Sequence, residues 1–170
     1  LGLFLVYPVV WSMIASFKHI PIFSLKTAGL FQFPGNFVGF AQYEKVLHNP
    51  LFIKSLFNTL YFGIIFIPLT MFSSAALAIL LNQGLKGTNT IRTLIFIPYI
   101  ISVVSASLIF MFLFNGQRGL VNGVIHLLGL HGPQWLASSY LAMPVIAIMS
   151  SWKTIGYMML IYLAGLQNIP

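Results

Sequence analysis

The chain has 170 residues, of which 59% are hydrophobic and 5% charged, and eight Lys and Arg oppose one acid, Glu44, for a formal net charge of +7. Soluble domains carry about 25% charged residues, so this composition predicts an integral membrane protein. The sequence has no Cys and no Asp, which excludes a disulfide framework, a cysteine zinc site and an Asp-based catalytic triad. The basic residues are scattered and do not form the stripe typical of nucleic-acid binding.

The first apolar run, Leu1–Phe17, carries no charge and ends at Lys18. It is at the short end of the roughly 20 residues that cross a bilayer, and we expect a membrane helix. A signal-peptide core is the alternative, but a basic leader is missing and Ala15–Phe17 is a poor cleavage site. Because the sequence begins inside one apolar run and ends directly after another, we expect it to be a fragment of a longer chain.

Three further apolar runs are predicted to be membrane helices: Ser55–Asn82, Thr93–Phe114 and Tyr140–Leu166. Each run contains one or more prolines, and we expect Pro68, Pro98 and Pro144 to bend their helices or expose backbone polar groups. No alternating strand pattern is visible. The predicted fold class is therefore all-α, a polytopic membrane helix bundle with about four transmembrane helices.

The long loop after the first run, Lys18–Lys54, holds three apolar residues at helical spacing: Phe40, Tyr43 and Leu47. This spacing predicts a short helix at the membrane interface, ended by Asn49-Pro50. A second interfacial helix is predicted over Leu120–Leu130, in the loop before the fourth run. Charge alone leaves the orientation open, because the first and third loops hold five cations and the much shorter second loop holds Lys86 and Arg92.

Lys153 lies at the centre of the fourth run, where insertion of a lysine costs roughly 2.5–3.5 kcal/mol. Such residues usually face a bundle interior or a watery cavity, and on a helix Lys153 shares a face with Gly156 and Tyr157. One interpretation is a solute pathway that uses the ammonium group and the Tyr157 hydroxyl. The other is a structural lysine that binds backbone carbonyls or extends to the interface at a subunit contact.

Two other polar positions in the apolar runs have the same two interpretations. Asn58 lies one turn inside the second run and is expected either to hydrogen-bond a neighbouring helix or to contact a ligand. Trp152 is expected to pack between helices, with ligand contact as the alternative. Trp135, just before the fourth run, is predicted to be an interfacial anchor.

The four runs contain no carboxylate, so ion-coupled secondary transport driven from this segment is disfavoured. No Gly-x4-Gly-Lys-Ser/Thr phosphate loop occurs, and ATP chemistry is therefore assigned to another chain, with no cofactor in this one. His126 and His131 lie near a Gly-rich turn without a carboxylate. We interpret them as loop histidines and predict no metal site.

Several short motifs follow one another in an order that resembles the sugar-type permeases of ABC importers. They are Phe37–Tyr43, Asn49–Phe52, Asn58–Leu60, Leu80–Asn82, Arg92–Thr93, Phe96–Pro98, Gly119–Asn122, Trp135–Leu136, Trp152–Met159 and Leu163–Pro170. The sequence is similar to the carbohydrate and glycerol-phosphate uptake group, of the type I kind that includes the maltose transporter's larger permease. One departure is the third run, which ends at Phe112–Phe114 without the tryptophan often found nearby.

The resemblance implies that residues 1–54 form the first transmembrane helix and a long external loop, and that residues 55–170 form the N-terminal part of the permease core. It implies a bacterial or archaeal cytoplasmic membrane, with the first and third loops outside. The implied partners are a second permease subunit, two ATP-binding cassette subunits that bind ATP and Mg, and an external solute-binding protein. A cytoplasmic coupling loop with a Glu-Ala-Ala…Gly signature is expected directly after Pro170.

The implied function is a non-enzymatic membrane subunit that forms part of the path of a sugar or related polyol. The residues expected to line that path are Lys153, Tyr157, Trp152 and Asn58. The alternative is a secondary transporter or channel subunit, which would need carboxylates in other helices. A membrane-embedded enzyme is less consistent with the sequence, because the serines of the third run have no His or acid at the same depth.

Overall fold

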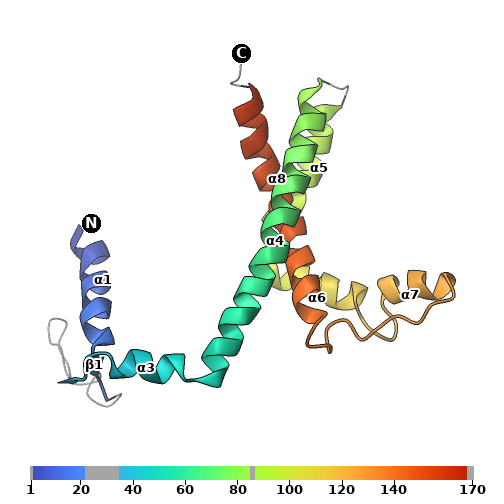
Figure 1. Ribbon diagram of the computed structural model, residues 1–170. Coiled ribbons are helices and arrows are strands. Elements are labelled where there is room, and N and C mark those ends of the chain that lie inside the picture. The colour runs from blue at the N-terminus through green and yellow to red at the C-terminus, as the bar shows by residue number, and fades with distance from the viewer. Residues whose placement is uncertain (1, 22–34, 85–86, 168–170) are drawn as a thin grey trace. The chain divides into compact units, whose positions relative to one another are not determined.

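The computed structural model describes residues 2–21, 35–84 and 87–167, and its contacts divide the chain into two units, Leu1–Phe57 and Asn58–Pro170. The boundary lies three residues after the division between residues 54 and 55 that the sequence suggested. Lys86 and the last three residues of the Leu163–Pro170 motif lie outside the described residues. Each unit is described by itself, with the elements labelled as in Figure 1.

The first unit begins with an apolar helix, α1 (Gly2–Ser16), followed by two short antiparallel strands, β1 (Lys18–His19) and β2 (Asn36–Phe37). These strands are an exception to the all-α prediction, and at two residues each they are too short to show a periodic pattern. Gly35 precedes β2 with φ of +98°, and a Cβ there would collide with the carbonyl of His19. Position 35 therefore requires glycine.

The short helix predicted around Phe40, Tyr43 and Leu47 is confirmed as α3 (Ala41–Leu47), and it ends before Asn49-Pro50 as expected, while its place at the membrane interface stays a prediction. The next helix, α4 (Pro50–Asn82), starts at Pro50, five residues before the apolar run. The Leu51 backbone N–H donates to Asn49 Oδ1 over 2.9 Å, so Asn49 caps the new helix while proline occupies its first position. With 33 residues, α4 is about 50 Å long, more than the roughly 30 Å of bilayer hydrocarbon.

The run Thr93–Phe114, predicted to be one membrane helix bent at Pro98, is broken more strongly than expected. The segment forms α5 (Thr88–Ile100) and α6 (Val103–Leu113), which are bent by 98° at the break between them. Ile101 and Ser102 are both extended, with ψ of 136° and 140°, so neither continues the helix. Pro98, one turn earlier, cannot donate a backbone hydrogen bond to the preceding turn, which weakens the end of α5.

The other two prolines behave differently. α4 continues as a single helix on both sides of Pro68. The last helix, α8 (Ala142–Gln167), starts two residues before Pro144, which places this proline in the first turn. The N–H groups of a first turn have no partner within the helix, so Pro144 removes no helical hydrogen bond. Of the three prolines expected to bend helices, Pro98 is the one that lies next to a break.

In the second unit α4, α5 and α8 pack together, and α7 (Leu120–Leu127) lies in the loop between α6 and α8 (Figure 1). α7 confirms the helix predicted over Leu120–Leu130, and it ends three residues earlier than predicted. The apolar core joins Ala78 and Leu81 of α4 to Met159 and Leu163 of α8. This core holds the helices on which the candidate site is built.

The apolar helices are those of a membrane protein. By length and hydropathy, α4 and α8 are long enough to cross a membrane, and the bent pair α5–α6 makes a third span if it is counted as one. The apolar part of α1, Phe4–Ser16, is shorter. The mainly helical fold is confirmed, whereas the count of four transmembrane helices is not.

Candidate functional site

The candidate site lies where α8 contacts the break between α5 and α6. Lys153, half-buried on α8, donates a hydrogen bond from Nζ to the carbonyl oxygen of Ile101, the first residue of the break. The carbonyls at the end of a helix lack partners within the helix and carry partial negative charge, so a cation is stabilising there. Lys153 therefore binds the exposed end of α5, a contact that matches the structural interpretation of this residue.

Gly156, one turn further along α8, allows the two helices to approach closely. A Cβ at this position would collide with the carbonyl oxygen of Ile95 and lie 2.8 Å from Phe96 Cα. Both atoms belong to the α5 backbone, which has little freedom to move away. A side chain at Gly156 would therefore separate α8 from α5.

Aromatic rings hold α8 on both sides of the break. The Tyr157 ring stacks on Tyr99 of α5, with centroids 4.8 Å apart and planes 10° apart. The Trp152 ring lies against Phe110 of α6, at a centroid distance of 5.5 Å. Trp152 is half-buried, whereas Tyr157 and Tyr99 are about 40% exposed. The tyrosines form a partly exposed ring pair, and Trp152 packs against α6.

A buried pair of hydroxyl groups joins α8 to α4 on another side. Thr70 Oγ1 donates to Ser151 Oγ over 3.0 Å, and Ser74 Oγ donates to the Thr70 carbonyl. All three residues are at most 3% exposed. Sequence reasoning missed this group, although hydroxyl residues four apart in an apolar run are a usable signal for a buried helix contact.

Asn58 does not join this site. It is half-buried on α4, and it precedes Thr70 by 12 positions, which correspond to about 18 Å along the helix. Four residues were predicted from the sequence to line the solute path. The structure brings three of them together at this site: Trp152, Lys153 and Tyr157. Tyr99 and Ile101 complete the group; a backbone carbonyl was one of the two predicted kinds of partner for Lys153, but the sequence did not indicate which carbonyl.

A second polar centre organises the loop around α7. The Asn122 side chain, 1% exposed, donates to the carbonyls of Gly116 (2.7 Å) and Pro133 (3.2 Å), and it accepts a 2.6 Å hydrogen bond from Trp135 Nε1. Trp135 also contacts Phe114 edge-to-face at 5.6 Å. The tryptophan predicted to be an interfacial anchor is thus hydrogen-bonded to the loop itself.

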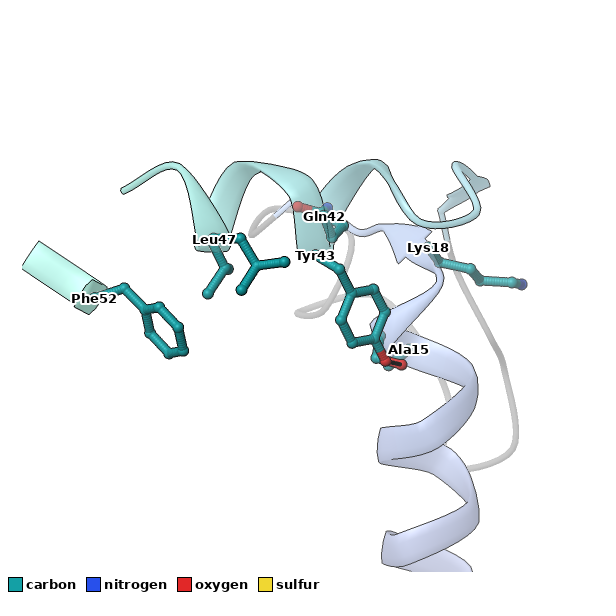
Figure 2. Close-up of a pocket in the computed structure, with 8 residues that line it drawn as sticks. Ala15, Lys18, Gln42, Tyr43, Leu47 and Phe52 are labelled. Atoms are coloured by element: carbon teal, nitrogen blue, oxygen red, sulfur yellow. Dashed lines mark hydrogen bonds between the residues drawn. The ribbon is translucent and has the colours of Figure 1, made fainter. Parts of the chain in front are cut away.

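Figure 2 shows a recess in the first unit, of about 480 Å³, beneath α3. Leu47 of α3 and Phe52 at the start of α4 face it, and the Tyr43 hydroxyl donates to Ser16 Oγ at its α1 side (2.7 Å). Most of the lining surface is apolar. A hydroxyl-rich ligand needs several converging polar groups, so this recess is less suited to a sugar than the α8 site.

No family model matches the chain. The chain is 36% identical over 170 residues to the sulfoquinovosyl glycerol transport system permease protein SmoG of Agrobacterium fabrum, covering all of this chain and 53% of the relative. It is 33% identical over 150 residues to the sn-glycerol-3-phosphate transport system permease protein UgpA of Pectobacterium atrosepticum, covering 87% of this chain and 50% of that protein. The chain thus spans about half the length of these curated relatives.

Solved structures give the same fold. A bacterial ABC transporter that imports the acidic polysaccharide alginate matches with a TM-score of 0.77 at 20% identity, over 99% of this chain and 54% of the matched chain. The bacterial alginate ABC transporter in complex with an alginate pentasaccharide-bound periplasmic protein matches with a TM-score of 0.68. The chain is thus homologous, over 87–100% of its own length, to permeases of carbohydrate and glycerol-phosphate ABC transporters, and it shares its fold with a solved ABC importer.

Proposed function

We propose that this chain is part of the membrane-spanning permease of an ATP-driven importer and forms a section of the translocation path for a sugar or related polyol. The observation that carries the proposal is the 36% identity, over the whole chain, to a permease named for sulfoquinovosyl glycerol transport. The relative named for glycerol-3-phosphate supports the same substrate class, a small polyhydroxylated solute.

Within this proposal, the accessible Tyr99–Tyr157 ring pair is the surface that the solute passes. A sugar presents apolar C–H faces and hydroxyl groups, which suit an aromatic plane beside polar side chains. Lys153 lies four residues before Tyr157 on the same face of α8, and it binds the Ile101 carbonyl at the 98° bend between α5 and α6. Trp152 supports the path through packing on Phe110, and Asn58 stays a candidate for a separate position along it.

The partners follow from the family. We propose a second permease subunit, two ATP-binding cassette subunits that hold ATP and Mg, and an external solute-binding protein, in a bacterial or archaeal cytoplasmic membrane. A related structure contains a substrate-bound periplasmic protein, which supports the last of these partners. α1 serves as a further span, with the α3 and α7 loops outside, and a coupling loop after residue 170 contacts the ATPases. Hydrolysis there drives alternating access.

The test is ATPase and uptake measurement on the complete transporter in proteoliposomes. Addition of a sugar-loaded binding protein is expected to stimulate ATP hydrolysis, and radiolabelled sugar is expected to accumulate only when ATP is present. An unloaded binding protein is the control. Sugar accumulation driven by an ion gradient without ATP would contradict the proposal, and so would a full-length sequence without a Glu-Ala-Ala…Gly loop.

A further inference from the structure

A polar pocket of about 330 Å³ lies at the end of the second unit, away from the break between α5 and α6. The last turn of α4, the first turns of α5 and the last turn of α8 surround it. Its lining residues are Leu81, Asn82, Gly84, Gly87, Thr88, Asn89, Arg92 and Gln167. In Figure 1 these three helix ends lie at the same end of the unit.

Arg92 is the charged group of this pocket. Its side chain is half-buried, and its Nε–H is fully buried without a hydrogen-bond partner among the described residues. A buried donor without an acceptor is unfavourable, and more so when it carries charge. The chain's single acid, Glu44, belongs to the other unit, so the second unit contains no carboxylate for Arg92. An anion bound in this pocket would supply both an acceptor and a countercharge for the guanidinium group.

The position of the pocket favours a lipid. The apolar stretch of α4 reaches Leu81 and the helix ends at Asn82, and a change from apolar to polar residues of this kind is expected where hydrocarbon meets water. On α5, beside Arg92, Ile91 is 41% and Leu94 is 61% exposed, as expected for side chains that face acyl chains. Phospholipid phosphates lie at this depth, and basic pockets between membrane helices bind acidic lipid headgroups.

The donors in the pocket suit a phosphate. A guanidinium group presents five N–H donors in a planar fork that matches phosphate oxygens, and Asn82, Asn89 and Gln167 add amide donors. α5 also begins at this pocket, with Gly87 preceding it and no side-chain cap at its N-terminus. The positive end of the helix adds to the attraction of an anion to Arg92.

We infer that this pocket binds the phosphate of an anionic membrane phospholipid, with Arg92 as its main ligand. The lipid headgroup neutralises Arg92 and joins the ends of α4, α5 and α8. This role is separate from solute transport, because the pocket and Lys153 lie at different places along the helices. If the pocket has this role, a phospholipid is expected to stay bound when the protein is extracted from the membrane.

Native mass spectrometry tests this inference on the full chain, purified with the subunits that accompany it, stripped of lipid and titrated with phosphatidylglycerol. Arg92→Gln is expected to weaken binding of the tightest lipid about tenfold or more, and Arg92→Lys less, because lysine keeps the charge but not the fork. Arg118→Gln, an exposed arginine before α7, is the matched control and is expected to bind as the wild type does. Asn89→Leu, at an exposed position, tests the pocket if Arg92→Gln fails to fold, and is expected to reduce affinity severalfold.

Equal lipid affinity for wild type, Arg92→Gln and Asn89→Leu would overturn the inference. A second titration with inorganic phosphate distinguishes the source of the anion. If inorganic phosphate competes but phosphatidylglycerol does not bind, a free phosphate is the ligand and the lipid assignment is overturned. If Arg92→Gln keeps its lipid but loses a subunit, the acceptor is a protein carboxylate, and the inference is overturned as well.

Discussion

The indole N–H of Trp135 donates a 2.6 Å hydrogen bond to Asn122 Oδ1, which joins two short motifs that are 13 residues apart in the sequence. The same amide donates to Gly116 and Pro133 through Nδ2, so one buried side chain holds both ends of the loop around α7. Gly132 leaves room for this amide, because a Cβ there would collide with the Asn122 side chain. Asn122 is thus the structural centre of the loop.

Asn122→Leu is expected to destabilise the loop. It leaves the Trp135 donor and two carbonyls without partners, and each unsatisfied buried group costs about 1–3 kcal/mol. The measurement is the unfolding temperature of the purified transporter, together with the fluorescence of Trp135. Gln117→Leu, an exposed amide in the same loop, is the control and is expected to have no effect. An unchanged unfolding temperature for Asn122→Leu would contradict this role.

Long apolar runs predict membrane helices well, for a physical reason. Over Ser55–Asn82 and Tyr140–Leu166 a helix satisfies every backbone group without water, so α4 and α8 form close to the predicted ranges. The break at Ile101 was not predictable in this way, because the composition stays apolar through it. The partner of the Ile101 carbonyl at this break is Lys153, 52 residues later in the chain, and so distant a contact is not visible in local composition.

The candidate site was only partly predictable, because its contacts join residues that are far apart in the sequence. Lys153 stands out because a lysine in an apolar run is costly, but its partner is a backbone carbonyl, which leaves no trace in the sequence. The Thr70–Ser151 contact joins residues 81 positions apart, and neither hydroxyl is unusual alone. Gly156 was selected as part of a motif, whereas its reason, the α5 backbone beside it, comes from the packing.

Gly156→Ala is expected to lower the stability and transport activity of the complex. The added methyl group would collide with the α5 backbone at Ile95 and Phe96, and overpacking of this kind typically costs about 1–3 kcal/mol. Gly165→Ala is a matched control on the same helix, because no atom lies within 4 Å of its Cβ position. Thermal unfolding of both variants provides the measurement. Equal stability of the two variants would show that α8 and α5 do not approach closely at Gly156.

Lys153→Met is expected to release the carbonyl of Ile101 and reduce both stability and uptake. A hydrogen bond from a charged group contributes about 1.5–3 kcal/mol, and this one is partly buried. Lys153→Arg keeps a donor and is expected to retain more activity. Uptake kinetics distinguish the two roles, since a changed KM in a fully assembled transporter indicates contact with the solute. Wild-type uptake and affinity in Lys153→Met would exclude this residue from the path.

The Thr70–Ser151 hydrogen bond is expected to couple α4 to α8 energetically. Hydrogen bonds between membrane helices contribute about 0.6 kcal/mol on average in double-mutant cycles, so Thr70→Val and Ser151→Ala should be less than additive by about this amount. The quantity to measure is the free energy of unfolding of the two single variants and the double variant. Ser107→Ala is the control, because Ser107 is exposed and bonds within its own helix, to the Val103 carbonyl. Additive losses for Thr70 and Ser151 would mean that the hydroxyl pair does not join the two helices, whose packing would then rest on the apolar core of Ala78, Leu81, Met159 and Leu163.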